Sequence, residues 1–210
     1  MGAAEPAADC GLCPRLAAFR HDNITAYPEF FNAPVPSFGK ADASLLVVGL
    51  APGLKGANRT GRPFTGDYAG DLLYATLTAH GFAEGTYKAD PADGLRLIDC
   101  AITNAVRCVP PQNKPTGDEA KTCRRFLAAR IAMHHKLKVI VALGRISHDN
   151  VLAALQKRRA MYPFGHAAAH DIGDGRVLID SYHCSRYNTN TGVLTPDMFA
   201  RVFVLARARL

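Results

Sequence analysis

Four short apolar runs divide the chain, and each gives way to a polar or glycine-rich stretch at its C-terminal end. The runs lie at about residues 44–50, 97–103, 138–143 and 176–180. Continuous apolar runs of this length are typical of strands that are covered on both faces, as in a parallel sheet. We therefore predict four central strands, three of which end in residues that suggest chemistry.

Segments with helical character separate these runs. Thr116 and Glu119 form the signature of a capping box, which predicts a basic helix that continues to Met133. Further helices are predicted at residues 15–21, 68–80, 145–157 and 196–210. Because strands and helices alternate, we expect one α/β domain over residues 1–210. Its architecture would be a three-layer α/β/α sandwich around a central, mainly parallel four-stranded sheet.

The loop after the first strand, residues 49–67, contains five glycines. Glycine permits positive φ and close approach of the backbone, so a planar or anionic ligand can lie against free N–H groups. The same composition also suits an ordinary connection between a strand and a helix. The carboxyl ends of parallel strands meet at one edge of a sheet. We therefore predict a ligand site where this loop meets Asn104 and residues 183–190.

The net charge of the chain bears on whether it binds nucleic acid. The net charge is +7 and the pI is near 9.2, an excess that attracts phosphate backbones, although many basic proteins bind no nucleic acid. No apolar run approaches the ~20 residues that a membrane span needs. The N-terminal residues lack the basic start and apolar stretch of a secretory signal. We expect a cytoplasmic protein that does not enter a membrane.

Four of the six cysteines have the spacing of a metal centre. Cys10 and Cys13 form a CxxC pair, and Cys108 and Cys123 come from distant segments, so four thiolates can surround one site. Zinc and an iron–sulfur cluster both suit this set. A redox CxxC is a third interpretation, although thioredoxin-type motifs lie at a turn between strand and helix. Cys100, in the second predicted strand, is expected to be a buried apolar thiol.

Taken together, four segments resemble a known family. They are GLAPGLKGANRTGRPFTGD (residues 49–67), NAVRC (104–108), the four spaced cysteines and HCSRYNTNTG (183–192). This combination resembles the iron–sulfur uracil-DNA glycosylases of family 5 (type B) over nearly the whole chain. One loop departs from the family pattern, which more often reads His-Pro-Ser where this chain has Cys184, a change that removes the rigidity of a proline. The resemblance implies a [4Fe–4S] cluster held by Cys10, Cys13, Cys108 and Cys123.

The resemblance also implies an activity. It predicts a hydrolase that removes uracil from DNA and leaves an abasic site, with hypoxanthine and xanthine as further substrates. We expect a monofunctional enzyme because no lysine is evidently placed to attack C1′, although Lys55 lies in the first motif. We also expect a monomer. A nucleotide-binding or phosphate-transfer enzyme is disfavoured because no Walker lysine and serine follow the glycines. The second alternative is an iron–sulfur module that recognises a damaged base in DNA without cutting.

Specific residues are expected to carry the reaction, because a glycosylase must flip its target base into a pocket. Phe64 would stack on the base, and the Asn104 carboxamide would pair with its edge. His183 would donate to the base carbonyl as negative charge develops. The alternatives to these three functional roles are structural: a core phenylalanine, a turn-capping asparagine and a hydrogen-bonding histidine. The full predicted substrate-binding set is Gly49, Ala51, Pro52, Gly53, Phe64, Asn104 and His183.

Asp67 is the nearest carboxylate that can position a water, because Leu50, Ala51 and Pro52 offer no side-chain base. It also suits the N-cap of the following helix. The third catalytic group would therefore be Asp67, beside Asn104 and His183.

Contacts with the duplex are expected from the last loop and from basic residues. Ser185, Arg186, Tyr187 and Asn188 would enter the minor groove and fill the gap left by the flipped nucleotide. Serine and asparagine there also suit a turn. The candidate phosphate contacts are Arg124, Arg125, Arg130 and residues 157–159. His134 and His135 are expected at the surface.

Overall fold

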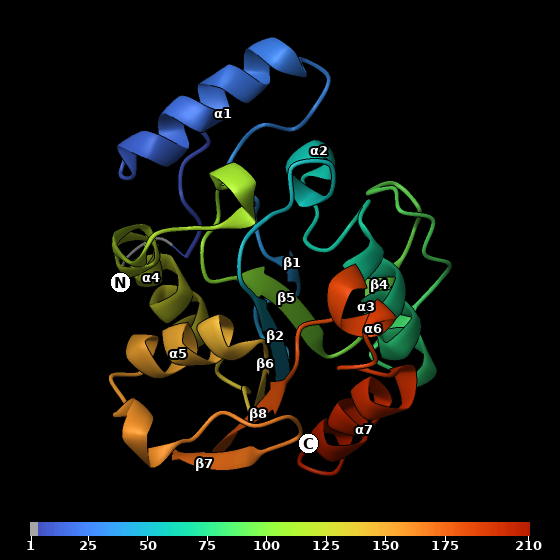
Figure 1. The fold of residues 1–210 in the computed structure, drawn as a ribbon. Helices are drawn as coiled ribbons and strands as arrows, with labels where there is room; N and C mark the ends of the chain where they lie inside the picture. The colour runs from blue at the N-terminus through green and yellow to red at the C-terminus, as the bar shows by residue number, and fades with distance from the viewer. Residues whose placement is uncertain (1–3) are drawn as a thin grey trace.

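A computed structural model describes residues 4–210, which form a six-stranded sheet between two layers of helices (Figure 1). The strand order is β1-β5-β2-β6-β8-β7. These strands are β1 (Phe38–Gly39), β2 (Leu45–Gly49), β5 (Cys100–Asn104), β6 (Val139–Leu143), β7 (Ala169–Gly173) and β8 (Arg176–Ser181). A separate two-stranded sheet pairs β3 (Ala83–Glu84) with β4 (Arg96–Leu97).

The four predicted strands correspond to the parallel centre of the sheet, β5, β2, β6 and β8. Every residue of β2, β5 and β6 is buried, as expected for strands covered on both faces. The sheet nevertheless has six strands rather than four, because β1 and β7 add antiparallel edges. The second predicted strand is also divided, since Asp99 has a φ of 47° and separates β4 from β5.

Helices occupy the intervals between the strands. Within residues 4–210 they are α1 (Pro14–Ala26), α2 (Ala57–Thr60), α3 (Tyr68–Ala79), α4 (Gly117–Met133), α5 (Arg145–Ala154), α6 (Arg186–Asn190) and α7 (Pro196–Arg207), with 3₁₀ turns at Pro111–Asn113 and Arg159–Met161. The capping box of Thr116 and Glu119 is confirmed at the start of α4. None of the described helices has the length and apolar character needed to cross a membrane.

Two apolar cores bind the helices to the sheet. On one face α3 and α7 contribute Leu73, Leu77 and Phe203, and on the other α4 and α5 contribute Leu127 and Val151. This gives the predicted three-layer sandwich (Figure 1). Helix α1 lies apart from both layers, at the end of the molecule where α2 is found (Figure 1).

Two predictions about surface residues are wrong. His134 is buried, and its Nδ1 lies 3.0 Å from the backbone oxygen of Ala43. Arg130 is also buried, donates to the backbone oxygen of Gly39 at 3.3 Å and lies 3.8 Å from a carboxylate oxygen of Glu5. Tertiary contacts therefore occupy both side chains, and Arg130 is not free to bind a phosphate.

Candidate active site

The carboxyl edge of the parallel sheet opens into a cavity of about 640 Å³. Loops from the ends of β2, β5 and β8 supply its walls, as predicted from the ends of the apolar runs. The predicted residues that line it are Ala51, Pro52, Gly53, Phe64, Asp67, Asn104, His183, Ser185 and Arg186. The chain therefore brings together residues that lie more than one hundred positions apart in the sequence.

Asn104, the last residue of β5, is positioned by its strand neighbour Gly49. The two residues pair in register, and a β-carbon on Gly49 would lie 2.4 Å from Asn104 Oδ1. Asn104 is buried, and its Oδ1 has no hydrogen-bond partner among residues 4–210. An amide with unused hydrogen-bonding capacity thus lines the cavity.

Phe64 lies against the same glycine. Its Cζ would be 2.5 Å from a β-carbon on Gly49, and its ring centroid lies 6.2 Å from that of His183. Phe64 has a φ of 53°, a left-handed conformation that is rare for a bulky residue. Such strain persists only where the surroundings enforce it, as they often do at binding sites.

Asp67 both caps α3 and faces the cavity. Its Oδ1 accepts from the Gly70 N–H at 3.2 Å, which realises the N-cap interpretation. Its Oδ2 points at the glycine loop, where a β-carbon on Gly56 would lie 2.3 Å away. Burial raises the pKa of Asp67, although the Gly70 N–H opposes that shift. One carboxylate oxygen is thus used structurally, and the other is directed toward the pocket loop.

His183 lies in the loop that follows β8. Burial lowers the pKa of its imidazole, which favours the neutral ring at neutral pH. The Asn188 side chain holds the loop by donating from Nδ2 to the His183 backbone oxygen at 2.8 Å. A neutral imidazole can donate one N–H to a ligand without carrying a charge into the cavity.

The predicted DNA-binding loop is a short helix, α6, at the rim of the cavity. Ser185 caps it by accepting from the Asn188 N–H at 3.3 Å, so both polar side chains serve the local fold. Arg186 and Tyr187 remain exposed, and 74% of the Tyr187 surface is accessible. The Arg186 guanidinium lies 5.2 Å from the centroid of the Tyr68 ring.

The pocket also contains residues that sequence reasoning did not select. Asn113 and Tyr68 line it. Asn113 has a φ of 56° and follows the prolines after β5, so the break in regular structure was its only signal. Tyr68 is the first residue of α3, directly after Asp67.

The four cysteines selected from their spacing all line one small enclosed cavity. They come from the start of α1, the loop after β5 and helix α4. Two N–H groups approach the sulfurs, the Arg20 guanidinium at 3.6 Å from Cys108 and the Arg107 backbone N–H at 3.4 Å from Cys123. Burial raises the pKa of Cys108 to about 12. Four cysteines around one cavity, with N–H donors at two of the sulfurs, suit a metal centre, whose charge would stabilise the thiolates.

The two remaining cysteines lie elsewhere. Cys100 is buried within β5, as predicted. Cys184 is buried beside the active-site loop, and its thiol donates to the backbone oxygen of Ala69 at 3.5 Å. This contact ties the loop to α3.

Comparison with known proteins identifies the family. Residues 36–206 match the family model of the Uracil DNA glycosylase superfamily. The chain belongs to this superfamily. Within it, the chain is 43% identical to a Type-5 uracil-DNA glycosylase of Thermus thermophilus over 203 residues, which cover 94% of this chain and 92% of that protein.

Two further members of the superfamily are also similar to this chain over most of its length or over its larger part. A Type-5 uracil-DNA glycosylase of Pyrobaculum aerophilum is 36% identical and covers 95% of this chain and 88% of its own length. A Type-4 uracil-DNA glycosylase of Thermotoga maritima is 38% identical over 132 residues, which cover 61% of this chain and 60% of that protein. The resemblance to family 5 of the uracil-DNA glycosylases, inferred from four segments, is therefore confirmed.

Proposed function

We propose that this protein is a monofunctional uracil-DNA glycosylase. It hydrolyses the bond between uracil N1 and the deoxyribose C1′, releases the base and leaves an abasic site. The observation that carries the proposal is the Asn104 amide, which is buried at the wall of the cavity with an oxygen that no donor in residues 4–210 reaches. A buried acceptor without a donor costs about 1–3 kcal/mol, and the N3–H of uracil offers that donor. The Asn104 NH₂ group can donate to a uracil carbonyl in return.

Phe64 and His183 complete the binding of the base. The Phe64 ring offers an apolar face for stacking, next to the amide. His183 donates its N–H to a base carbonyl oxygen on which negative charge develops as the bond breaks. Because its imidazole is held neutral by burial, the donor needs no proton from solvent at neutral pH.

Asp67 acts on the sugar side of the scissile bond. As the C1′–N1 bond breaks, its electron pair leaves with the base, and the sugar develops positive charge. The Asp67 oxygen that faces the glycine loop positions a water for attack on C1′ and accepts its proton. The released uracil anion then takes a proton from solvent.

Recognition of the duplex is assigned to the start of α6. Arg186 lines the cavity, and the next residue along α6, Tyr187, is exposed. A flipped nucleotide leaves a gap in the base stack beside its pocket. Tyr187 is proposed to fill that gap, and Arg186 to contact a phosphate. Ser185 and Asn188 support this surface through their contacts within the loop.

We also propose that Cys10, Cys13, Cys108 and Cys123 hold a [4Fe–4S] cluster. When bound, such a cluster joins separate chain segments through iron–thiolate bonds. In this chain it would fasten the N-terminal segment and α4 to the loop that directly follows Asn104, the last residue of β5. Its role is structural, because the cavity that it would occupy is not the one that contains Asp67 and His183.

Hypoxanthine and xanthine are proposed as further substrates. A cavity of about 640 Å³ is larger than a pyrimidine requires and can admit a purine. Purines present a different edge to Asn104 and His183, so their excision should depend more strongly on both residues.

One assay separates excision from binding alone. The protein is incubated with an end-labelled duplex that carries a single uracil, and half of each sample is then heated in alkali. A break at the uracil position that appears only after alkali supports a monofunctional glycosylase, and His183→Ala should abolish it. Binding without a break would support the module that recognises the base without cutting. A break without alkali would contradict the monofunctional assignment.

A further inference from the structure

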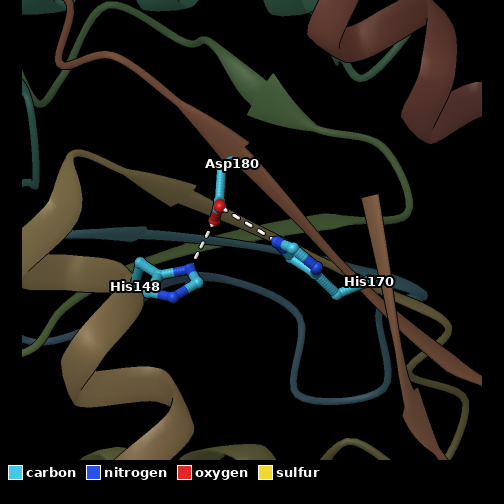
Figure 2. Close-up of side chains that lie close together, drawn as sticks. All are labelled: His148, His170 and Asp180. Carbon is cyan, nitrogen blue, oxygen red and sulfur yellow. Dashed lines mark hydrogen bonds and ion pairs between the residues drawn. The ribbon is translucent and has the colours of Figure 1, made fainter. Parts of the chain in front are cut away.

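Asp180 is the centre of a buried polar cluster at the carboxyl end of β8, three positions before His183 (Figure 2). Its side chain is fully buried. His148 approaches it from α5, and His170 approaches it from β7 (Figure 2). A buried carboxylate is stable only where it is well hydrogen-bonded, so its partners indicate what it does.

Three N–H groups surround the Asp180 carboxylate. His148 Nδ1 lies 2.7 Å from Oδ1, His170 Nε2 lies 3.3 Å from Oδ2, and the Gly165 backbone N–H donates to Oδ2 at 3.3 Å. The other nitrogen of His148, Nε2, lies 2.9 Å from the backbone oxygen of Tyr162. A carbonyl only accepts, so Nε2 carries a hydrogen. A second proton must then lie between Nδ1 and the carboxylate, because two lone pairs would otherwise face each other.

Two histidines and a carboxylate can also bind a metal, and their ligand atoms lie within 4.8 Å of one another. The distances favour a hydrogen bond between these side chains over a bound metal ion. Zinc bonds to nitrogen and oxygen are about 2.0–2.2 Å long, which in a tetrahedral site separates two ligand atoms by roughly 3.3 Å. The 2.7 Å between His148 and Asp180 is the length of a charge-assisted hydrogen bond.

Hydrogen bonds also hold the two residues between Asp180 and His183. The Ser181 backbone oxygen accepts from the Gly144 N–H at 2.8 Å. The Tyr182 N–H donates to His166 Nδ1 at 3.2 Å. His166 Nε2 lies 3.1 Å from the backbone oxygen of Met198, so the ring must be a neutral Nε2–H tautomer to make both bonds. Burial lowers the pKa of His166, in agreement with that neutral form.

We propose that Asp180 is a positioning residue for His183. Its bonds to His148 and His170 fix the end of β8, and His166 fixes Tyr182, so the His183 imidazole is delivered to the pocket in one orientation. The inference rests on the proposed role of His183 in excision. It assigns a function to three histidines that lie outside the pocket.

The test compares Asp180→Asn with the matched control Asp174→Asn. Asp174 lies in the turn between β7 and β8, and its side chain is 78% exposed. The single-turnover rate of uracil excision in Asp180→Asn should fall about 10- to 100-fold, as expected when a reacting group is misplaced. The affinity for a uracil duplex should stay within about threefold of wild type. If Asp180→Asn does not fold, His170→Gln takes its place in the test. The His170 side chain is 12% exposed, and this variant should show a smaller fall in the excision rate.

A second measurement does not depend on activity. In protein with ¹⁵N-labelled histidine, Asp180→Asn should shift or broaden the His183 ring signals, whereas Asp174→Asn should leave them in place. If wild-type protein excises no uracil, the proposed function fails, and this measurement still tests the positioning.

Two results would overturn the inference. The first is a folded Asp180→Asn protein with a wild-type excision rate and unchanged His183 signals. The second is stoichiometric zinc in the wild-type protein that is lost in His170→Gln, which would make the cluster a metal site.

Discussion

Gly49 and Asn104 lie opposite each other at the carboxyl ends of β2 and β5, at a distance that leaves no room for a side chain on Gly49. A β-carbon there would lie 2.4 Å from Asn104 Oδ1 and 2.5 Å from Phe64 Cζ. The amide proposed to pair with the base and the ring proposed to stack on it therefore meet at one glycine. A single methyl group would displace both.

Gly49→Ala should consequently impair base recognition without unfolding the protein. Because both Phe64 and Asn104 must move, we expect the single-turnover excision rate to fall about 10²-fold. The preference for a uracil duplex over an undamaged duplex should shrink in a binding assay. Gly11→Ala is the control, since a β-carbon at Gly11 meets no atom within 4 Å. Wild-type discrimination in Gly49→Ala would show that the amide and the ring do not act together.

Asp67→Asn should lower the rate of uracil excision and raise the stability of the folded protein. The buried carboxylate is held with a raised pKa, so its ionised form is unfavourable in the folded protein. Asparagine keeps an oxygen for the Gly70 N–H and removes the charge. The melting temperature should rise by roughly 2–4 °C, the shift expected for about 1 kcal/mol in a protein of this size. Single-turnover excision should fall by ~10²-fold or more, since the asparagine cannot accept a proton from water.

The gain in stability should depend on pH in a defined direction. A carboxyl with a raised folded pKa favours folding at low pH, and that contribution is lost as the pH rises through the folded pKa. The difference in melting temperature between Asp67→Asn and wild type should therefore be small near pH 4 and larger at pH 7. Asp22→Asn on the exposed face of α1 is the control. A difference that shrinks with rising pH would contradict the raised pKa.

Substitution of individual cysteines should separate the cluster ligands from the other thiols. Cys108→Ser or Cys123→Ser should lose iron and sulfide together, because each sulfur lines the proposed cluster cavity. Cys100→Ser and Cys184→Ser should keep both, since these thiols are buried elsewhere. The measurement is iron and acid-labile sulfide per chain in protein purified without oxygen. Zinc in place of iron would contradict the [4Fe–4S] assignment.

The sequence predicted the centre of this molecule better than its edges. Strands β2, β5 and β6 are buried at every position, and β8 is buried from Leu178 onward, so each contributed an apolar stretch to the sequence. The edge strand β7 alternates between exposed and buried positions, and β1 has only two residues, so neither produced an apolar run.

The candidate site shows the same contrast. Asn104 and His183 followed from the rule that parallel strands end at one edge. The contacts of Asp180 could not be predicted in this way, because they depend on the pairing of β7 with β8 and on the orientation of α5. The prediction for Arg130 was wrong for a related reason. Glu5, its partner, lies far away in the sequence and is brought close only by the fold.

Arg186 and Tyr187 should contribute differently to DNA binding. Arg186→Ala should weaken binding to damaged and undamaged duplexes alike, and should lower the slope of log affinity against log salt by about 0.9, the value for one phosphate contact. Tyr187→Ala should reduce excision from a duplex more than from a single strand, where no stack has to be opened. Because both side chains are exposed, neither change should alter the melting temperature. An unchanged salt slope in Arg186→Ala would remove the phosphate contact from the proposal.

Only three residues separate Asn104 at the pocket from Cys108 at the cysteine cavity. Within that stretch, the Ala105 and Val106 N–H groups bond to the backbone oxygens of Gly49 and Leu50, each at 2.9 Å. Under the proposed function, the cluster thiol of Cys108 and the amide that pairs with the base are therefore attached to the same short stretch of backbone. Because Asn104 pairs with Gly49 in the sheet, loss of the cluster would loosen the chain from Arg107 onward and would reach the amide only through these two backbone bonds.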